Sequence, residues 1–269
     1  MDNDDVQVGR LLSRREVLAM MGATSLAILV GCSSDEDAAT TPTARAANTA
    51  ASGATAVASP TQASASAATT TAPACVVRPA LTEGPYFVDE KINRSDIRSD
   101  PSDGSVKDGT TLALTFNVFT ISDRCTPLEG ATVDVWHCDA AGVYSGVDDP
   151  GFSTVGQKFL RGYQLTDASG QAKFVTIYPG WYQGRTVHIH FKIRTDADGQ
   201  SYEFTSQLFF DDAFTDQVYA GEPYAAKGER TLRNDGDGIF QQSGGQLTLA
   251  TSQVSDGYAA TFDIGLQMT

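Results

Sequence analysis

The clearest pattern in the sequence is an alternation of apolar and polar residues that becomes regular near residue 111. Leu112, Leu114, Phe116 and Val118 occupy every second position of 111–119, which is the period of a strand with one buried face. Similar runs occur at 131–137, 171–177, 186–194, 203–210, 245–250 and 258–264. Turns rich in Gly, Pro, Asp and Ser separate these runs, and no long helical period competes. The pattern predicts an all-β fold, a β-sandwich of mainly antiparallel strands.

The first residues of the chain show a different pattern, an Arg pair followed by an apolar run. Ser-Arg-Arg-Glu-Val-Leu at 13–18 leads into a run at 17–31 that is short for a membrane span. The run ends in Leu-Val-Gly-Cys at 29–32. Residues 1–32 thus resemble a twin-arginine export signal with the lipobox of bacterial lipoproteins, in which Cys32 becomes lipidated. An uncleaved membrane anchor or a chance Arg pair is the alternative.

Composition separates the rest of the chain into a linker and one domain. Residues 33–74 consist mainly of Ala, Thr and Ser, so we expect a disordered linker. Residues 75–269 hold the strand pattern and are expected to form one domain. The net charge of −14 argues against a nucleic-acid partner. With residues 1–32, this organisation predicts an exported protein anchored to the membrane surface through Cys32.

Three cysteines follow Cys32, at positions 75, 125 and 138. In an oxidising compartment, one disulfide and one remaining thiol is the simplest arrangement. The sequence does not fix the pairing. We expect Cys75 to pair with Cys125 and Cys138 to be buried. No Cys-x-x-Cys spacing is present, which argues against a cysteine metal site.

The strongest local feature is a pair of histidines in the run at 186–193, Thr-Val-His-Ile-His-Phe-Lys-Ile. On a strand, the apolar residues of this run face the core, while His188 and His190 share the other face, close enough to bind one metal. A purely structural or exposed pair is also compatible with the pattern. His137 is the only other histidine, so a three-His zinc site is an alternative. A cupin-type site is disfavoured because Ile193 and Arg194 stand where its Glu is expected and no His follows His190.

Tyr144 and Tyr182 lie in loops and are the remaining candidate ligands, and with them an ordered series of motifs emerges. The series resembles the intradiol ring-cleavage dioxygenases, the family of catechol 1,2-dioxygenase and protocatechuate 3,4-dioxygenase. It comprises Thr82-Glu-Gly-Pro-Tyr-Phe87, Val133-Asp-Val-Trp136, Ala141-Gly-Val-Tyr144, Pro179-Gly-Trp-Tyr182, Arg185, His188-Ile-His190 and Gln207.

The resemblance implies a prealbumin-like β-sandwich and a ferric ion, Fe(3+), bound by Tyr144, Tyr182, His188 and His190. Physical chemistry agrees, because a tyrosine with a pKa near ~10 becomes a ligand at neutral pH only when a strong Lewis acid displaces its proton. Two phenolates and one hydroxide would balance the three charges of iron(III), and neutral imidazoles add none.

The activity implied by the resemblance is cleavage of a catechol-type aromatic by O2 between its two hydroxylated carbons, giving a cis,cis-muconic acid. The catechol would bind iron through both oxygens, and Tyr182 would leave the metal and take a proton. Arg185 would stabilise negative charge on the attacked ring carbon. Gln207 matches a family residue near the iron.

Some positions remain open alternatives at this point. Tyr163 and Tyr178 are rival phenols, His137 is expected to pack rather than bind metal, and Tyr86 is a candidate wall of a substrate pocket. Only five residues separate Tyr182 from His188, fewer than in the protocatechuate enzymes, so substrate choice is not implied.

Oligomeric state is not implied either, because the signal and linker stand where catechol 1,2-dioxygenases carry a helical dimerisation segment. The competing functions are a non-catalytic surface β-sandwich that binds a partner and a zinc hydrolase using His137, His188 and His190.

Overall fold

The computed structural model describes residues 75–121, 125–197 and 200–268. The expected signal at 1–32 and linker at 33–74 lie outside the described residues and stay predictions. Within the described ranges, no helix is both long enough and apolar enough to cross a bilayer.

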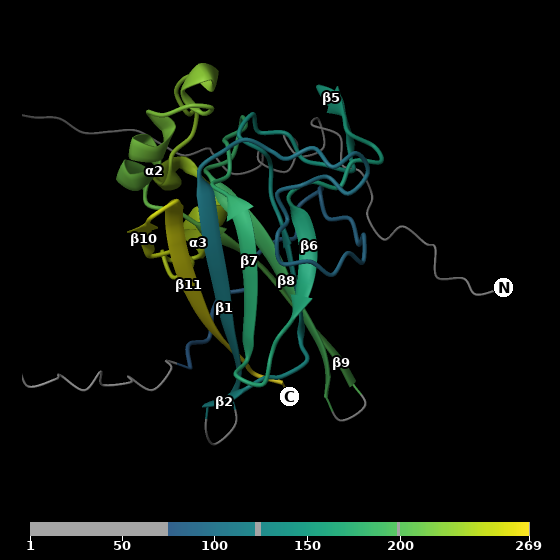
Figure 1. Ribbon diagram of the computed structural model, residues 1–269. Helices are drawn as coiled ribbons and strands as arrows, with labels where there is room; N and C mark the ends of the chain where they lie inside the picture. Colours follow the sequence, from purple (N-terminus) through teal and green to yellow (C-terminus); the bar gives the residue numbers. More distant parts are fainter. Residues whose placement is uncertain (1–74, 122–124, 198–199, 269) are drawn as a thin grey trace, which may run out of the picture. The chain divides into compact units, whose positions relative to one another are not determined.

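Strands make up most of the regular structure, and the helices are short (Figure 1). The strands are β1 (Thr111–Ile121), β2 (Cys125–Pro127), β3 (Thr132–Trp136), β4 (Asp148–Asp149), β5 (Phe152–Ser153), β6 (Arg161–Leu165), β7 (Gln171–Ile177), β8 (His188–Ala197), β9 (Gln200–Phe209), β10 (Thr251–Val254) and β11 (Gly257–Leu266). The helical segments are α2 (Asp212–Tyr219), η1 (Ala225–Lys227), η2 (Asn234–Gly236) and α3 (Gly238–Gln242).

Two larger sheets form the domain. β1 is a central strand of the five-stranded sheet. Along one of its sides β1 pairs in parallel with β11, and along its other side it pairs antiparallel first with β7 and then with β2. The four-stranded sheet has the order β6-β3-β8-β9 and is antiparallel throughout. The predicted β-sandwich of mainly antiparallel strands is confirmed.

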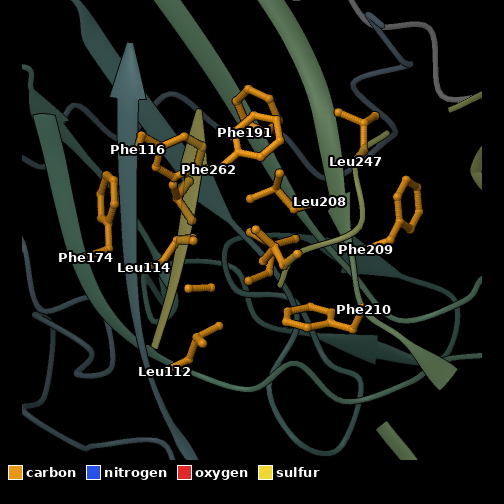
Figure 2. Close-up of a cluster of buried hydrophobic side chains, with 14 of the residues drawn as sticks. Leu112, Leu114, Phe116, Phe174, Phe191, Leu208, Phe209, Phe210, Leu247 and Phe262 are labelled. Atoms are coloured by element: carbon orange, nitrogen blue, oxygen red, sulfur yellow. The ribbon is translucent and has the colours of Figure 1, made fainter. Parts of the chain in front are cut away.

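The core lies between the two sheets and follows the alternation in the sequence. Leu112, Leu114, Phe116 and Val118 of β1 have no exposed surface. Phe116 meets Phe191 of β8 with ring centroids 5.2 Å apart, which joins one sheet to the other (Figure 2). Because Phe191 and its alternate neighbours point into this core, the residues between them on β8 face outward from the sandwich.

A segment that we call the strap, residues 79–96, covers that outward face. At one side of the sheet, Leu81 N donates to Thr205 O of β9 at 3.1 Å. At the other side, Tyr163 N of β6 donates to Ile92 O at 2.9 Å. The strap therefore crosses the four-stranded sheet from β9 to β6, over the face that carries the two histidines.

One predicted strand, at 245–250, is wrong. Leu247 and Leu249 are buried, but they lie in a turn and a short irregular stretch, and the strand β10 begins only at Thr251. Their backbone bonds go to the end of β9, with Phe209 N donating to Leu247 O and Leu249 N donating to Phe209 O. The alternation there reflects two leucines that fill the core from a loop.

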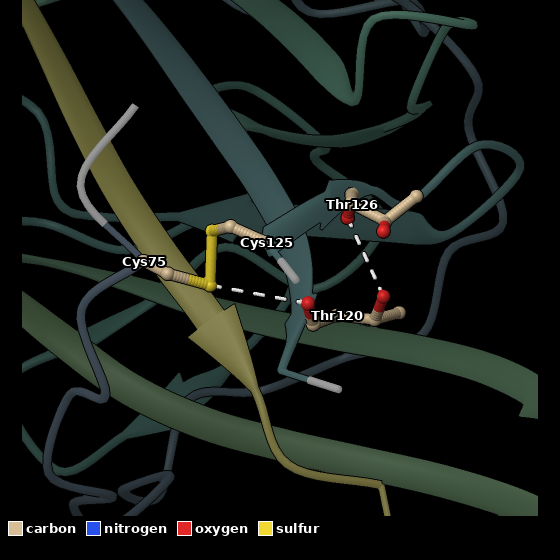
Figure 3. The surroundings of a disulfide bond; sticks show 4 residues. All are labelled: Cys75, Thr120, Cys125 and Thr126. Carbon is tan, nitrogen blue, oxygen red and sulfur yellow. Dashed lines mark hydrogen bonds between the residues drawn. A yellow bond between two sulfur atoms is a disulfide. The ribbon is translucent and has the colours of Figure 1, made fainter. Parts of the chain in front are cut away.

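A disulfide joins Cys75 to Cys125, with their Cα atoms 5.5 Å apart (Figure 3). It ties the beginning of the domain to β2, which is also linked to β1 by a hydrogen bond from Thr120 Oγ1 to Thr126 O. Cys138 is free and buried. Both cysteine expectations are confirmed.

Candidate functional site

Four side chains from three parts of the chain converge at one end of β8. Tyr144 lies in the loop after β3, Tyr182 lies in the loop after β7, and His188 and His190 begin β8. His188 Nε2 is 3.2 Å from Tyr182 Oη, 3.4 Å from Tyr144 Oη and 3.0 Å from His190 Nε2. The structure thus brings together the four residues that the sequence singled out as candidate ligands.

The backbone fixes the tautomer of His188. Its Nδ1 lies 2.7 Å from Thr186 O, and a carbonyl can only accept, so the proton sits on Nδ1. The lone pair of His188 is then on Nε2, the atom that faces the other three groups. This is the arrangement by which proteins orient a metal-binding imidazole.

His190 is held by stacking rather than by a hydrogen bond. Its ring lies parallel to that of Trp136, with centroids 5.0 Å apart and an 8° angle between the planes. Its Nδ1 has no hydrogen-bond partner within the described part of the chain. Gly84 of the strap also lies close to the ring, since a Cβ there would be 3.1 Å from His190 Cε1. This close approach and the left-handed backbone of Gly84, with φ 76°, both favour glycine at this point.

Burial keeps all four groups neutral without a metal. It raises the pKa of Tyr144 well above its ordinary value, and the nearby Tyr182 adds to this effect. Burial also raises the pKa of Tyr182, although Arg185 opposes it. The pKa values of His188 and His190 are well below their ordinary range, again mainly because of burial. Neutral imidazoles are ready to bind a metal, whereas the phenols must first release protons.

The geometry and the donor set fit a ferric ion. Ligand atoms about 2 Å from one metal and at right angles to each other lie about 3 Å apart, close to the 3.0–3.4 Å separations around His188 Nε2. The two oxygen donors are phenols, which become anionic ligands for a highly charged cation such as iron(III).

The three-His zinc site is contradicted. No group of three or more His, Cys, Asp or Glu residues that could hold a metal occurs in residues 75–121, 125–197 and 200–268. Both ring nitrogens of His137 are used by protein atoms, Nδ1 with Cys138 O at 2.8 Å and Nε2 with Thr176 Oγ1 at 2.6 Å.

Arg185 and Gln207 lie beside the histidines and contact each other. Gln207 is fully buried and sits opposite His190 in the register of β8 and β9. Its Oε1 accepts from Arg185 Nη2 at 2.6 Å, and its Nε2 donates to Thr82 O of the strap at 2.8 Å. Gln207 therefore does not face solvent but holds Arg185 next to the site.

Tyr86 of the strap lies against both candidate phenol ligands. Its ring stacks on Tyr144 with centroids 4.5 Å apart and meets Tyr182 edge-on at 6.4 Å. Its hydroxyl donates to Asp149 Oδ2 at 2.8 Å. Tyr86 thus forms part of the wall around the four converging groups.

The rival phenols lie elsewhere. Tyr178 is buried against Phe210, with centroids 4.4 Å apart, and its hydroxyl bonds Thr215 Oγ1 at 2.7 Å. Tyr163 lies on β6, hydrogen-bonded to the strap.

Two residues near the site were missed by sequence reasoning. Asp237 accepts from Arg185 Nε at 2.9 Å. Lys227 Nζ donates both to Ala141 O and to Trp181 O, and so links the two loops that carry Tyr144 and Tyr182. The Asp-Gly-Asp-Gly stretch at 235–238 predicted only a turn, and nothing in the sequence marked Lys227.

Comparison with known proteins agrees with this arrangement. The sequence model of a family described as "Dioxygenase" matches residues 82–267. The chain is 28% identical over 153 residues to chlorocatechol 1,2-dioxygenase of Pseudomonas sp. (strain P51), covering 50% of this chain and 55% of that protein. It is 33% identical over 112 residues to the protocatechuate 3,4-dioxygenase beta chain of Burkholderia cepacia, covering 38% and 47% respectively. The chain thus spans about half of the length of these curated relatives.

Solved structures match over more of the domain. The intradiol ring-cleavage dioxygenase from Tetranychus urticae superposes with a TM-score of 0.63 at 32% identity, covering 72% of this chain and 95% of that one. The dioxygenase domain of a dioxygenase and carbohydrate-binding protein fusion from Streptomyces sp. SirexAA-E gives a TM-score of 0.51 at 28% identity, covering 72% and 100%. The chain belongs to the intradiol ring-cleavage dioxygenase family.

Proposed function

We propose that the protein is a non-haem iron(III) enzyme that uses O2 to split a catechol-type aromatic between its two hydroxylated carbons, giving a muconate-type product. The convergence of two phenols and two imidazoles around His188 Nε2 carries the proposal. Family membership supports it. A non-catalytic binding module would have no need for three such groups within 3.4 Å of His188 Nε2.

Tyr144, Tyr182, His188 and His190 would hold the metal. Bound iron(III) would chelate both oxygens of the catechol and make the ring reactive toward dioxygen. Tyr144 is 1% exposed, whereas Tyr182 is only half-buried. Of the two phenols, Tyr182 would therefore be the one that takes up a substrate proton at its phenolate oxygen.

Arg185 would act on the substrate through its charge. Its guanidinium is fixed beside the histidines by Gln207 and leaves a cation where negative charge develops on the ring carbon. Gln207 supports this cation, because its amide oxygen accepts from Arg185 while its nitrogen is engaged by the strap.

We also propose that the protein is exported by the twin-arginine route and anchored to the membrane surface through lipidated Cys32. The motifs at 13–18 and 29–32 support this proposal. The disulfide between Cys75 and Cys125 is compatible with it, because such bonds persist outside the reducing cytoplasm. Metabolic labelling with a fatty acid, compared between the wild type and Cys32→Ser, tests the anchor.

The visible spectrum of the purified, iron-loaded protein tests the proposed activity. We expect a tyrosinate-to-iron absorption band that shifts when catechol is added without oxygen, and a muconate-type product once O2 is admitted. Tyr182→Phe should change the band of the resting protein, because it removes a phenolate ligand. Tyr178→Phe is the matched control and should leave the band unchanged, since Tyr178 bonds Thr215. A colourless protein after iron loading would overturn the proposal.

A further inference from the structure

Asp237 is a buried carboxylate that no step of the proposed reaction has yet used. Its side chain is 2% exposed, and it lies between η2 and α3. Its Oδ2 accepts from Arg185 Nε at 2.9 Å and from Thr186 N at 2.8 Å. Its Oδ1 accepts from two backbone N–H groups in the first turn of α3, those of Ile239 and Phe240. One oxygen thus caps a helix while the other faces the site.

The contact with Arg185 fixes a guanidinium from two sides. Asp237 holds Nε, and Gln207 Oε1 accepts from Nη2 at 2.6 Å. Two bonds in the plane of a guanidinium define its orientation. Asp237 and Gln207 thus engage Nε and Nη2, and Nη1 makes no hydrogen bond to another described residue.

The contact with Thr186 reaches a candidate metal ligand. Thr186 N donates to Asp237, and Thr186 O accepts from His188 Nδ1 at 2.7 Å. The Thr186 hydroxyl donates to Asn234 Oδ1 at 2.6 Å. Asn234 and Asp237 therefore hold Thr186, the residue whose carbonyl accepts from His188.

Asp237 is charged at neutral pH. Burial alone would raise its pKa, but the cation of Arg185 and the N–H of Thr186 outweigh burial and leave the pKa below its ordinary value. A charged carboxylate gives stronger hydrogen bonds to Arg185 than a neutral group would.

We propose that Asp237 is a positioning residue of this site, which orients Arg185 toward the substrate. The inference rests on the proposed function. It assigns a supporting role in the site to Asp237, a residue that contributes no group touching the metal or the substrate.

Two substitutions separate positioning from helix capping. Asp237→Asn removes the negative charge at nearly constant shape. Asp237→Ser retains a good cap for α3 but is too short to reach Arg185. We expect both to lower kcat by about 10- to 100-fold, the usual range for groups that orient a site, with little change in KM. Asp235→Asn is the matched control, because Asp235 is exposed in the same turn, and it should leave kcat unchanged.

A double-mutant cycle with Arg185→Gln gives the decisive readout, together with urea unfolding of each iron-free variant. If Asp237 acts through Arg185, Asp237→Asn should change kcat by less than about threefold in the Arg185→Gln background. A purely structural role would instead give additive losses of kcat and a matching loss of stability, and that result would overturn the inference. Whichever result the cycle gives, a coloured and active wild-type protein would still support the proposed function. An inactive, colourless wild type would overturn both.

Discussion

Histidines in this protein differ in which ring nitrogens remain available. His137 uses Nδ1 and Nε2 for groups outside the candidate site, whereas His188 uses Nδ1 for Thr186 O and directs Nε2 toward the other three candidate ligands. Because of this difference, His137 is a packing residue, whereas His188 can bind a metal. A count of histidines in the sequence could not make this distinction, because it depends on what lies across from each ring.

His137 should make stability depend on pH. Burial lowers its pKa to about 4, from about 6.5 in an unfolded chain. The unfolded state therefore binds more protons between these values, so stability is full above pH 6.5 and is lost as the pH falls toward 4. When the pH is lowered from 7.5 to 5, protonation linked to His137 should reduce the free energy of unfolding by about 2 kcal/mol.

Urea unfolding of the iron-free protein at these two pH values measures the effect, with His137→Gln as the comparison. The variant should lose about 2 kcal/mol less than the wild type on acidification, whatever its stability at pH 7.5. Equal losses in the two proteins would show that His137 is not the group responsible.

At the scale of elements, the candidate site depends on two loops that cross closely. Gly180, in the loop that carries Tyr182, donates its N–H to Asp139 O in the loop that carries Tyr144. A Cβ on Gly180 would lie far inside van der Waals contact with the carbonyl oxygens of Asp139 and Ala140. Because the obstacle is backbone rather than a flexible side chain, the loops would have to separate.

Gly180→Ala should therefore destabilise the protein by about 1–3 kcal/mol, the cost of forcing atoms into a packed region, and should weaken iron binding. Gly238→Ala is the control, since a Cβ there meets nothing within 4 Å and alanine favours the helix α3. Urea unfolding and iron titration of the two variants provide the comparison. A Gly180→Ala protein as stable as the Gly238→Ala protein would contradict the close crossing of the loops.

The sequence predicted the strands whose buried faces are apolar, but not the others. β1, β7 and β11 alternate clearly, whereas β6 was missed. One side of β6 carries Gly162 and Gln164 and so has no apolar side chain, while Tyr163 and Leu165 share the other side with Arg161. The two helices α2 and α3 have only eight and five residues, too few for a helical period to emerge. Local pattern thus predicted the layers but not the connections between them.

At the scale of the whole molecule, the candidate site combines segments that are far apart in the chain. The motifs predicted which phenols and imidazoles come together. They could not predict Asp237, which follows Arg185 by 52 positions, or Lys227, which reaches back 86 positions to Ala141. Such contacts depend on how the strap, the loops and the C-terminal segment pack. A single sequence therefore shows the groups suited to the chemistry more readily than those that position them.

The disulfide and the candidate site lie at opposite ends of β1. Ile121 at the end of β1 pairs with Cys125, while Thr111 at its start pairs with Ile177, just before the loop of Tyr182. Eleven residues of strand span about 30 Å. Stability and site chemistry should therefore respond separately to loss of this bond.

The double variant Cys75→Ser/Cys125→Ser tests that separation. Closing a loop with a sequence separation of 50 residues restricts the unfolded chain, so its removal should lower the unfolding free energy by about 2–4 kcal/mol. The absorption band of the iron-loaded protein and its kcat at 25 °C should stay unchanged, because β1 and its partners still hold the site from the other end. Urea unfolding and the visible spectrum measure the two quantities on one preparation. A lost band with unchanged stability would mean that the disulfide supports the site and not the fold.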